Sequence, residues 1–338
     1  MKQSIKPRPK LDQLVNGILQ GDRVILGQAI TLVESKLEHD ARLAESALEK
    51  IIHKTGQALR IGITGAPGVG KSTFIEAFGK HVTGQGKKLA VLTIDPSSPL
   101  TKGSILGDKT RMEELARNPL AFIRPTAASS TLGGVAHKTR EAMLLCEAAG
   151  YEVIIIETVG VGQSEVAVKS MVDFFLLLML AGAGDELQGI KRGIVEIADA
   201  VVISKADGDN VKAAAAAQTI YQQALHLLSA SESGWKPPVL TASAVRGEGI
   251  EAIWKMILRY QRETTASGFF EKNRRHQHIS WFRDSFSQLL QREIEKSDAL
   301  RAKQKALEQS VMNHDISSQI AARQMLEAYY LAIRGNKT

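Results

Sequence analysis

The sequence has few of the residues that build metal clusters or disulfide frameworks. It holds a single cysteine, Cys146, in 338 residues. That excludes an internal disulfide and any zinc or iron–sulfur site made from several cysteines. Cys146 follows the apolar residues Met143, Leu144 and Leu145, so we expect it on a buried helix face. The eight histidines are scattered, with no spacing typical of metal ligands.

Long hydrophobic runs and strong charge are also lacking. The longest apolar run, 174–181, is far shorter than the roughly 20 residues of a membrane-spanning helix, and it fits a buried parallel strand. No apolar core follows the basic residues of 1–10, so we expect no secretory signal. The net charge of +7 is modest, and we interpret the basic clusters as solvated tails and helix faces. We therefore predict a cytoplasmic enzyme with no membrane insertion and no nucleic-acid partner.

What the chain does have is a glycine-rich stretch at 65–72, GAPGVGKS, that fits the phosphate-binding pattern G-x-x-x-x-G-K-[ST]. A predicted strand at 59–64 precedes it and a predicted helix follows it. In such a loop the backbone N–H groups surround a phosphate at a helix N-terminus. Lys71 would reach the β- and γ-phosphates, and the Ser72 hydroxyl would bind Mg²⁺. The predicted nucleotide contacts of this loop are Gly65, Ala66, Pro67, Gly68, Val69, Gly70, Lys71, Ser72 and Thr73.

Apolar strands alternate with helical stretches from 59 to 249, which predicts an α/β fold with a mostly parallel central sheet flanked by helices. Residues 1–58 form a predicted helical extension, and 250–338 a C-terminal helical region with helices at 250–261, 277–295 and 299–333. The predicted strands are 59–64, 89–95, 120–124, 152–157, 174–180, 200–204 and 238–242.

Acidic residues stand at the carboxyl ends of two of these strands, where a phosphate-loop enzyme needs its Mg²⁺ ligands. Glu157 would lie near Mg²⁺, and the N–H of Gly160 near the γ-phosphate. Asp95 would orient a water or a metal-bound water, and Asp108 would be a further metal carboxylate. We predict Lys71, Asp95 and Glu157 as catalytic, and Ser72, Asp95, Asp108 and Glu157 as the metal site.

Many small GTPases carry a water-orienting glutamine directly after the motif glycine. Here that position is Val161, and the nearest glutamine is Gln163. We expect slow intrinsic hydrolysis that a partner can stimulate.

A second pattern concerns the base. Residues 204–207, Ser-Lys-Ala-Asp, resemble the guanine-reading motif N-K-x-D, with Ser204 in place of asparagine. Asp207 would accept hydrogen bonds from the guanine N1–H and N2–H₂, a donor pair that adenine lacks, and Lys205 would lie along the base. Ser243 and Ala244 would form the last guanine contact. Losing the asparagine amide removes a group that usually ties loops together, which affects affinity more than base choice.

With these motifs in place, the chain resembles the metallochaperone-type P-loop GTPases and, among them, the MeaB/ArgK family. The likeness spans about residues 10–335. The motifs that carry it are 65–73, 95–99 (DPSSP), 107–112 (GDKTRM), 157–165 (ETVGVGQSE) and 182–193 (GAGDELQGIKRG).

This resemblance implies a function that the motifs alone do not supply. Family members use GTP to gate adenosylcobalamin delivery to methylmalonyl-CoA mutase and to protect that enzyme. It further implies GTP/GDP and Mg²⁺ as cofactors, a homodimer joined through C-terminal helices, and a mutase-sensing loop, switch III, that includes Asp185 and Lys191.

Three alternatives stay open at this point. A nickel metallochaperone would need cysteine and histidine clusters, which the chain lacks. A kinase or ATPase linked to arginine or ornithine transport is opposed by Asp207. A targeting GTPase of the signal-recognition type would need a methionine-rich or RNA-binding region, and the eight methionines are scattered.

Overall fold

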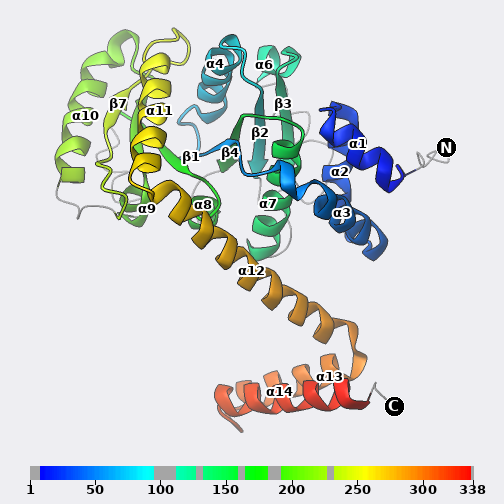
Figure 1. The fold of residues 1–338 in the computed structure, drawn as a ribbon. Coiled ribbons are helices and arrows are strands. Elements are labelled where there is room, and N and C mark those ends of the chain that lie inside the picture. The colour runs from blue at the N-terminus through cyan, green and yellow to red at the C-terminus, as the bar shows by residue number, and fades with distance from the viewer. Residues whose placement is uncertain are drawn as a thin grey trace, which may run out of the picture. The chain divides into compact units, whose positions relative to one another are not determined.

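The computed structural model describes residues 8–94, 112–126, 132–158, 164–181, 192–226 and 232–335 (Figure 1). The chain divides into two compact units, Met1–Gln277 and His278–Thr338. The predicted division into an N-terminal extension (1–58), a GTPase domain (59–249) and a C-terminal helical region (250–338) stays a prediction.

The first unit is built on a seven-stranded sheet in which all the paired strands are parallel, in the order β3-β2-β4-β1-β5-β6-β7. The predicted fold class and all seven predicted strands are confirmed. The strands are β1 (Leu59–Gly65), β2 (Leu89–Ile94), β3 (Ala121–Thr126), β4 (Val153–Thr158), β5 (Phe174–Leu180), β6 (Ala200–Ser204) and β7 (Val239–Thr241).

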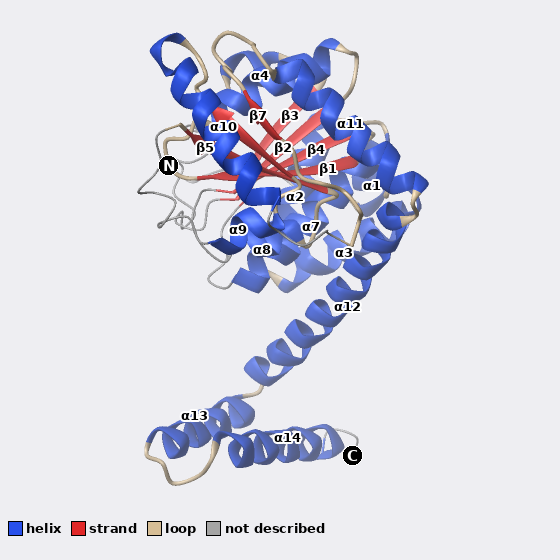
Figure 2. Cartoon of the chain, turned by 90° about the vertical axis from the view of Figure 1, so that its left-hand side faces the viewer, coloured by secondary structure: helices blue, strands red, loops and turns tan. Residues whose placement is uncertain are grey.

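Helices cover both faces of this sheet (Figure 2). One face packs on α4 (Lys71–Gly84), α6 (Glu113–Arg117) and α11 (Ile250–Ala266). The other packs on α7 (Leu132–Ala148), α8 (Ser164–Lys169), α9 (Arg192–Ile197) and α10 (Val211–His226). Because both faces are covered, the strands are mainly apolar on both sides rather than alternating, and β1, β2, β4 and β6 are buried at every residue.

The N-terminal extension is helical, as its periodicity predicts. It consists of α1 (Leu11–Leu19), α2 (Arg23–Glu34), α3 (Glu38–Ile51) and a short 3₁₀ turn, η1 (Ile52–Lys54). The three helices pack on one another, and α2 and α3 pack on α7. Cys146 lies on α7 and is fully buried, so its predicted place in the core is confirmed.

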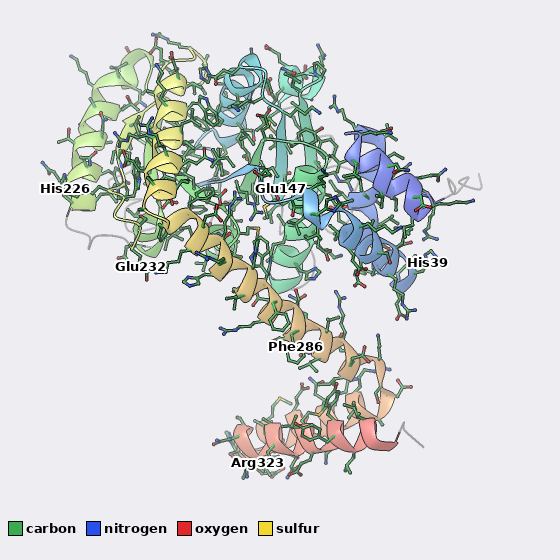
Figure 3. The ribbon with its side chains drawn as sticks, in the orientation of Figure 1. His39, Glu147, His226, Glu232, Phe286 and Arg323 are labelled. Carbon is green, nitrogen blue, oxygen red and sulfur yellow. The ribbon has the colours of Figure 1, made fainter. Side chains whose placement is uncertain are left out.

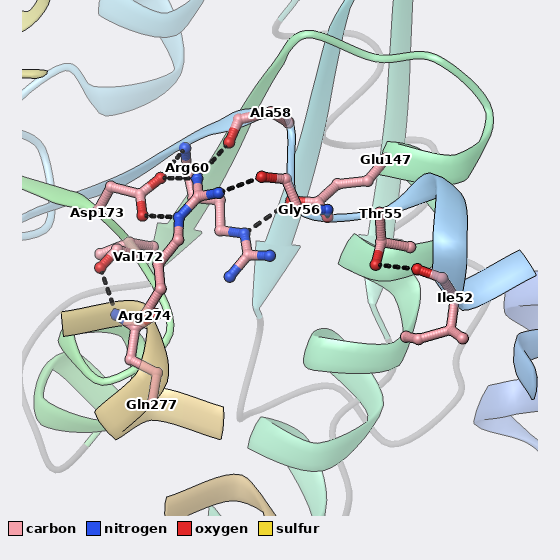
Figure 4. A network of polar contacts seen from close by, with 10 residues as sticks. All are labelled: Ile52, Thr55, Gly56, Ala58, Arg60, Glu147, Val172, Asp173, Arg274 and Gln277. Carbon is pink, nitrogen blue, oxygen red and sulfur yellow. Dashed lines mark hydrogen bonds and ion pairs between the residues drawn. The ribbon is translucent and has the colours of Figure 1, made fainter. Parts of the chain in front are cut away.

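A network of buried charges joins four parts of the first unit (Figure 4). Arg274, near the start of α12 (Phe269–Lys296), donates from Nε to Asp173 Oδ1 at 2.8 Å and from Nη2 to Asp173 Oδ2 at 2.7 Å. Asp173 Oδ2 also accepts from the backbone N–H of Arg60, on β1, at 2.8 Å. The Arg60 side chain donates from Nε to Glu147 Oε1 on α7 at 2.7 Å. The network fixes the amino end of β1 against α7 and α12.

The second unit holds the rest of α12 and an antiparallel pair formed by α13 (Asp298–Met312) and α14 (Ser318–Gly335). The predicted continuous helix over 299–333 is wrong at 313–317. There His314 takes φ +63°, and Asp315 donates its N–H to the Ser310 carbonyl at 2.9 Å. Asn, Asp and Ser side chains compete for backbone hydrogen bonds, which favours a turn over a helix.

Within the described residues, none of the helices has the length and apolar character needed to cross a membrane.

Breaking the buried ion pair is expected to destabilise the protein strongly. Asp173→Ala leaves the Arg274 guanidinium buried without its carboxylate, a change that costs about 3–5 kcal/mol. Urea unfolding of the two proteins measures it. Arg42→Ala, which removes an exposed pair with Glu38, is the matched control and should cost no more than about 0.5 kcal/mol. Equal losses in the two variants would contradict the assignment.

Burial also gives the protein a pH dependence at alkaline pH. It raises the pKa of the Cys146 thiol well above its usual value of about 8.5, with the nearby Glu147 adding to the shift. Above about pH 8.5 the unfolded chain ionises while the native chain does not, so stability falls as pH rises, by up to about 1.4 kcal/mol per pH unit. Unfolding curves between pH 7 and 10 should show this slope, and Cys146→Ala should lack that part of it. If the free energy of unfolding fell equally with pH in the parent and in Cys146→Ala, the prediction would be refuted.

Candidate active site

The glycine-rich loop connects β1, near the middle of the sheet, to the N-terminus of α4. Gly65 has φ +155°, and a Cβ at this position would lie 2.5 Å from the carbonyl oxygen of Leu178. Gly70 has the left-handed conformation at the N-cap of α4, with φ +97°. Glycine is the residue that meets both demands, and the loop can therefore close around a phosphate at the positive end of the helix dipole.

Lys71 lies across the opening of this loop. Its Nζ donates hydrogen bonds to the carbonyl oxygens of Gly65, at 2.7 Å, and of Ala66, at 3.1 Å. Burial lowers the pKa of Lys71, and the carboxylates of Glu157 and Glu165 raise it in part. The phosphate loop thus holds the ammonium group of Lys71. The same group is predicted to contact a phosphate bound in this loop.

Ser72 and Glu157 meet beside the loop. The Ser72 hydroxyl donates to Glu157 Oε1 at 3.4 Å, and Glu157 is buried. Glu157 pairs in register with Ile63 on β1 and with Thr93 on β2, so it lies at the carboxyl edge of the sheet. The structure thus brings together two of the predicted metal ligands.

A hydroxyl and a carboxylate are donors that Mg²⁺ accepts, so this pair fits the metal. In the part of the chain that the structure describes, no group of three His, Cys, Asp or Glu side chains could hold a metal by protein ligands alone.

Glu165 was missed among the predicted site residues. It lies on α8, is 1% exposed, and its carboxylate, like that of Glu157, offsets part of the lowering of the Lys71 pKa by burial. A glutamate inside a short helix carries no local signal of such a role. Its place at the end of the 157–165 motif was the one available sign.

The base-reading motif adjoins the phosphate loop through Ser204. This residue ends β6, and its hydroxyl is within 2.8 Å of the Val69 carbonyl oxygen and 3.0 Å of the Met179 carbonyl oxygen. We expected the serine to lack the hydrogen bond that the asparagine amide makes between loops, and this expectation is wrong. The hydroxyl reaches the phosphate loop directly and can replace the amide in this role.

Lys205, Asp207 and Ser243 are also brought together. Lys205 has φ +54°, and its Cε lies 3.8 Å from where a Cβ on Gly70 would be, so its stem runs beside the phosphate loop. The Ser243 hydroxyl donates to Asp207 Oδ2. Ser243 and Ala244 follow β7 in a short turn. The side chains predicted to read guanine thus share one site with the phosphate loop.

Five predicted site residues lie outside the described residues: Asp95, Asp108, Gly160, Asp185 and Lys191. Their roles, and those of the described site residues in binding nucleotide or metal, stay predictions. Asp95 directly follows Ile94, which pairs with Thr158 at the carboxyl edge of the sheet.

A parallel sheet with a glycine-rich loop between its β1 strand and the helix α4 defines a P-loop nucleoside triphosphatase. The chain belongs to the MeaB family of GTPases, because the family model described as "Methylmalonyl Co-A mutase-associated GTPase MeaB" matches residues 26–298.

Relatives from distant organisms are similar to this chain over nearly its whole length. The GTPase ArgK of Escherichia coli is 47% identical over 318 residues, covering 94% of this chain and 96% of the relative. The mouse "Methylmalonic aciduria type A homolog, mitochondrial" is 44% identical over 336 residues, covering 96% of this chain and 81% of the relative. A crystal structure titled "LAO/AO transport system kinase" matches with a TM-score of 0.75 and 39% identity, covering 95% of this chain and 97% of that one.

Ser204→Ala is expected to weaken binding of GTP. The variant removes the hydroxyl that reaches the Val69 carbonyl, a hydrogen bond worth about 0.5–1.5 kcal/mol, which corresponds to a loss of about 2- to 12-fold in affinity. Titration with a fluorescent GTP analogue measures the change. Ser46→Ala removes a half-buried hydroxyl of α3 that donates to the Arg42 carbonyl, outside the predicted nucleotide site; it is the control and should bind like the parent. Unchanged affinity in the Ser204 variant would show that the hydroxyl is not needed.

Proposed function

We propose that this chain is a GTP-hydrolysing chaperone that gates the loading of adenosylcobalamin into methylmalonyl-CoA mutase and protects that enzyme. The observation that carries this proposal is the match of the MeaB family model to residues 26–298. The mouse relative, named for methylmalonic aciduria, supports it.

The chemistry assigned to the site is in-line attack of water on the γ-phosphate of GTP. Lys71 balances the charge that develops on the phosphate oxygens, and Ser72 with Glu157 would hold Mg²⁺. Mg²⁺ bound there would neutralise charge on the β- and γ-phosphate oxygens. In this proposal Asp95 would orient water, Asp108 would be a further ligand of the metal, and the Gly160 N–H would contact the γ-phosphate.

Guanine selection is assigned to Asp207 and the residues around it. The Ser243 hydroxyl holds one carboxylate oxygen of Asp207, and this orients the group toward the edge of a base. The backbone N–H of Ala206 donates to the Ala242 carbonyl at 3.0 Å, which ties the two base loops to each other. A carboxylate that pairs with N1–H and N2–H₂ rejects ATP. This weighs against a transport kinase, although one similar crystal structure carries that title.

The partner-sensing part of the proposal concerns 182–193. By its likeness to switch III, this segment, with Asp185 and Lys191, responds to the mutase. In the chain it connects β5, which pairs with β1 and so borders the phosphate loop, to β6, which ends at the base motif.

We also propose that the protein is a cytoplasmic homodimer joined through its C-terminal helices. In the second unit, α12 carries four exposed apolar side chains at intervals of three and four residues, the spacing of a helix-packing seam. They are Ile279, Phe282, Phe286 and Leu289, each at least half exposed (Phe286 is labelled in Figure 3). A second copy of this chain can bury them.

The test is GTP turnover by the purified protein, with and without an adenosylcobalamin-dependent mutase from the same organism. Turnover should be slow alone, because Val161 replaces the water-orienting glutamine, and should rise several-fold with the mutase. ATP should not be hydrolysed. Lys71→Ala should abolish turnover, whereas Lys54→Ala, which changes an exposed lysine, should not. In sedimentation velocity the parent should have the mass of a dimer, and the double variant Phe282→Glu, Phe286→Glu that of a monomer.

Each part of the proposal can fail separately. Turnover that ignores the mutase would remove the chaperone function and leave a GTPase. Preferential ATP hydrolysis would overturn the assignment of Asp207, and a monomeric parent would refute the dimer.

A further inference from the structure

A cavity of about 510 Å³ lies in the first unit, away from the nucleotide site. It is enclosed by the final residues of α8, α9 and α10, the segment before β7, one residue of α11 and the first turns of α12. His226 and Glu232, two of its lining residues, are labelled in Figure 3. The volume is that of a site for a small molecule.

The cavity and the phosphate loop are at opposite edges of the sheet. Asp199 and Pro238, which line the cavity, directly precede β6 and β7. The phosphate loop follows the carboxyl end of β1. Because the strands are parallel, the cavity is at their amino ends, and the nucleotide cannot occupy it.

Aromatic and aliphatic side chains form one part of the cavity wall. Trp235 is buried and donates from Nε1 to the Asp199 carbonyl at 2.8 Å. The guanidinium of Arg259 lies 4.8 Å from the centre of the Trp235 ring. The rings of Trp235 and Tyr260 are nearly perpendicular, with their centres 5.2 Å apart. Other apolar lining residues are Ile197, Leu225, Pro237, Pro238 and Phe269.

Tyr260 gives the cavity an unused donor. Its side chain lines the cavity and the residue is 2% exposed, yet its hydroxyl makes no hydrogen bond to any residue that the structure describes. Burial, together with Asp199 and Asp173, raises the pKa of Tyr260. The phenol therefore stays protonated and offers its O–H to an acceptor. A hydroxyl that faces a cavity can donate to a ligand that supplies an acceptor, which adds a hydrogen bond to the packing of the ligand.

Lys169 supplies further donors beside it. Its Nζ contacts Asp199 Oδ2 at 2.5 Å, and the same oxygen accepts from the Phe175 N–H at 2.7 Å. The carboxylate of Asp199 is thus satisfied by two partners, and burial raises its pKa. An ammonium group has three donors, so Lys169 can still donate to a ligand. The rim carries charges of both signs, so it favours neither an anionic nor a cationic group on the ligand. These residues are Lys236, Lys272, Glu196 and Glu232.

We propose that this cavity binds a small molecule with an aromatic or aliphatic body and a carboxylate, whose oxygens accept from Tyr260 and Lys169 while the body packs on Trp235. This inference does not depend on the proposed function.

The test uses three probes with one body and different head groups: 4-phenylbutyrate, 4-phenylbutanol and 4-phenylbutylamine. A ligand of about 12 non-hydrogen atoms binds such a site with a Kd on the order of 1 mM. Ligand-observed NMR on the full chain, up to about ten times that concentration, measures each Kd. The carboxylate should bind with one site per chain, the alcohol more weakly, and the amine not at all.

Two variants locate the site. Tyr260→Phe should weaken phenylbutyrate binding about tenfold, because it removes a hydrogen bond to a charged group. Tyr151→Phe changes another buried tyrosine outside the cavity and should bind like the parent. Asn273→Trp fills the cavity from α12 and should abolish binding. GTP affinity and thermal midpoint, checked in all variants, report whether each is folded.

Three results would overturn the proposal. One is the absence of binding by the carboxylate in the parent protein. Another is tighter binding of the amine, which would make Asp199 the anchor. The third is equal binding of the carboxylate to the parent and to a folded Asn273→Trp variant, which would place the ligand elsewhere.

Discussion

The bidentate ion pair between Arg274 and Asp173 is the constraint on which the first unit depends. A buried pair of this kind gains little net stability over apolar residues, because both charges lose their water. Its effect is on geometry. Asp173 precedes β5 and also holds the backbone of Arg60 on β1, while Arg274 Nη2 donates to the Ala58 carbonyl at 2.6 Å. The pair therefore fixes how β1 enters the sheet, and β1 carries the phosphate loop.

The sheet separates two kinds of environment. At the carboxyl edge, backbone N–H groups, hydroxyls and carboxylates gather around the end of β1, where charged phosphates are to be bound. At the amino edge, aromatic rings enclose a cavity with a phenol and an ammonium group beside the buried Asp199. Parallel strands produce this division, because every loop that follows a strand lies on one side and every loop that precedes one lies on the other.

The regular part of the fold could be predicted from the sequence because its signals are local. A strand buried on both faces is a mainly apolar run, which is continuous in β5, ends in Glu157 and Thr158 in β4, and is broken by Arg60 and Thr64 in β1. The phosphate loop follows from glycines whose spacing is a backbone requirement. The turn at 313–317 was missed because an apolar periodicity continues on both sides of it. Only the turn residues around His314 indicate the break.

The contacts between segments could not be predicted in the same way. Glu165 acts on Lys71, and Arg274 contacts Ala58, across distances in sequence that no local pattern encodes. The cavity at the amino edge is assembled from six such segments. The serine at 204, where related motifs have asparagine, suggested that a hydrogen bond between loops is lost. The sequence does not show that the Val69 carbonyl lies within hydrogen-bond distance of the Ser204 hydroxyl.

That serine has one further consequence. A hydroxyl carries a single proton, and Ser204 has two carbonyl oxygens within reach, one on the phosphate loop and one on β5. An asparagine amide could donate to both at once, whereas the hydroxyl serves one at a time. Rotation about the Cβ–Oγ bond redirects the O–H of Ser204 from the Val69 carbonyl to the Met179 carbonyl without moving a heavy atom. The hydrogen bond that ties Ser204 to the phosphate loop is therefore made and broken by the rotation of one hydroxyl, which an asparagine amide does not allow.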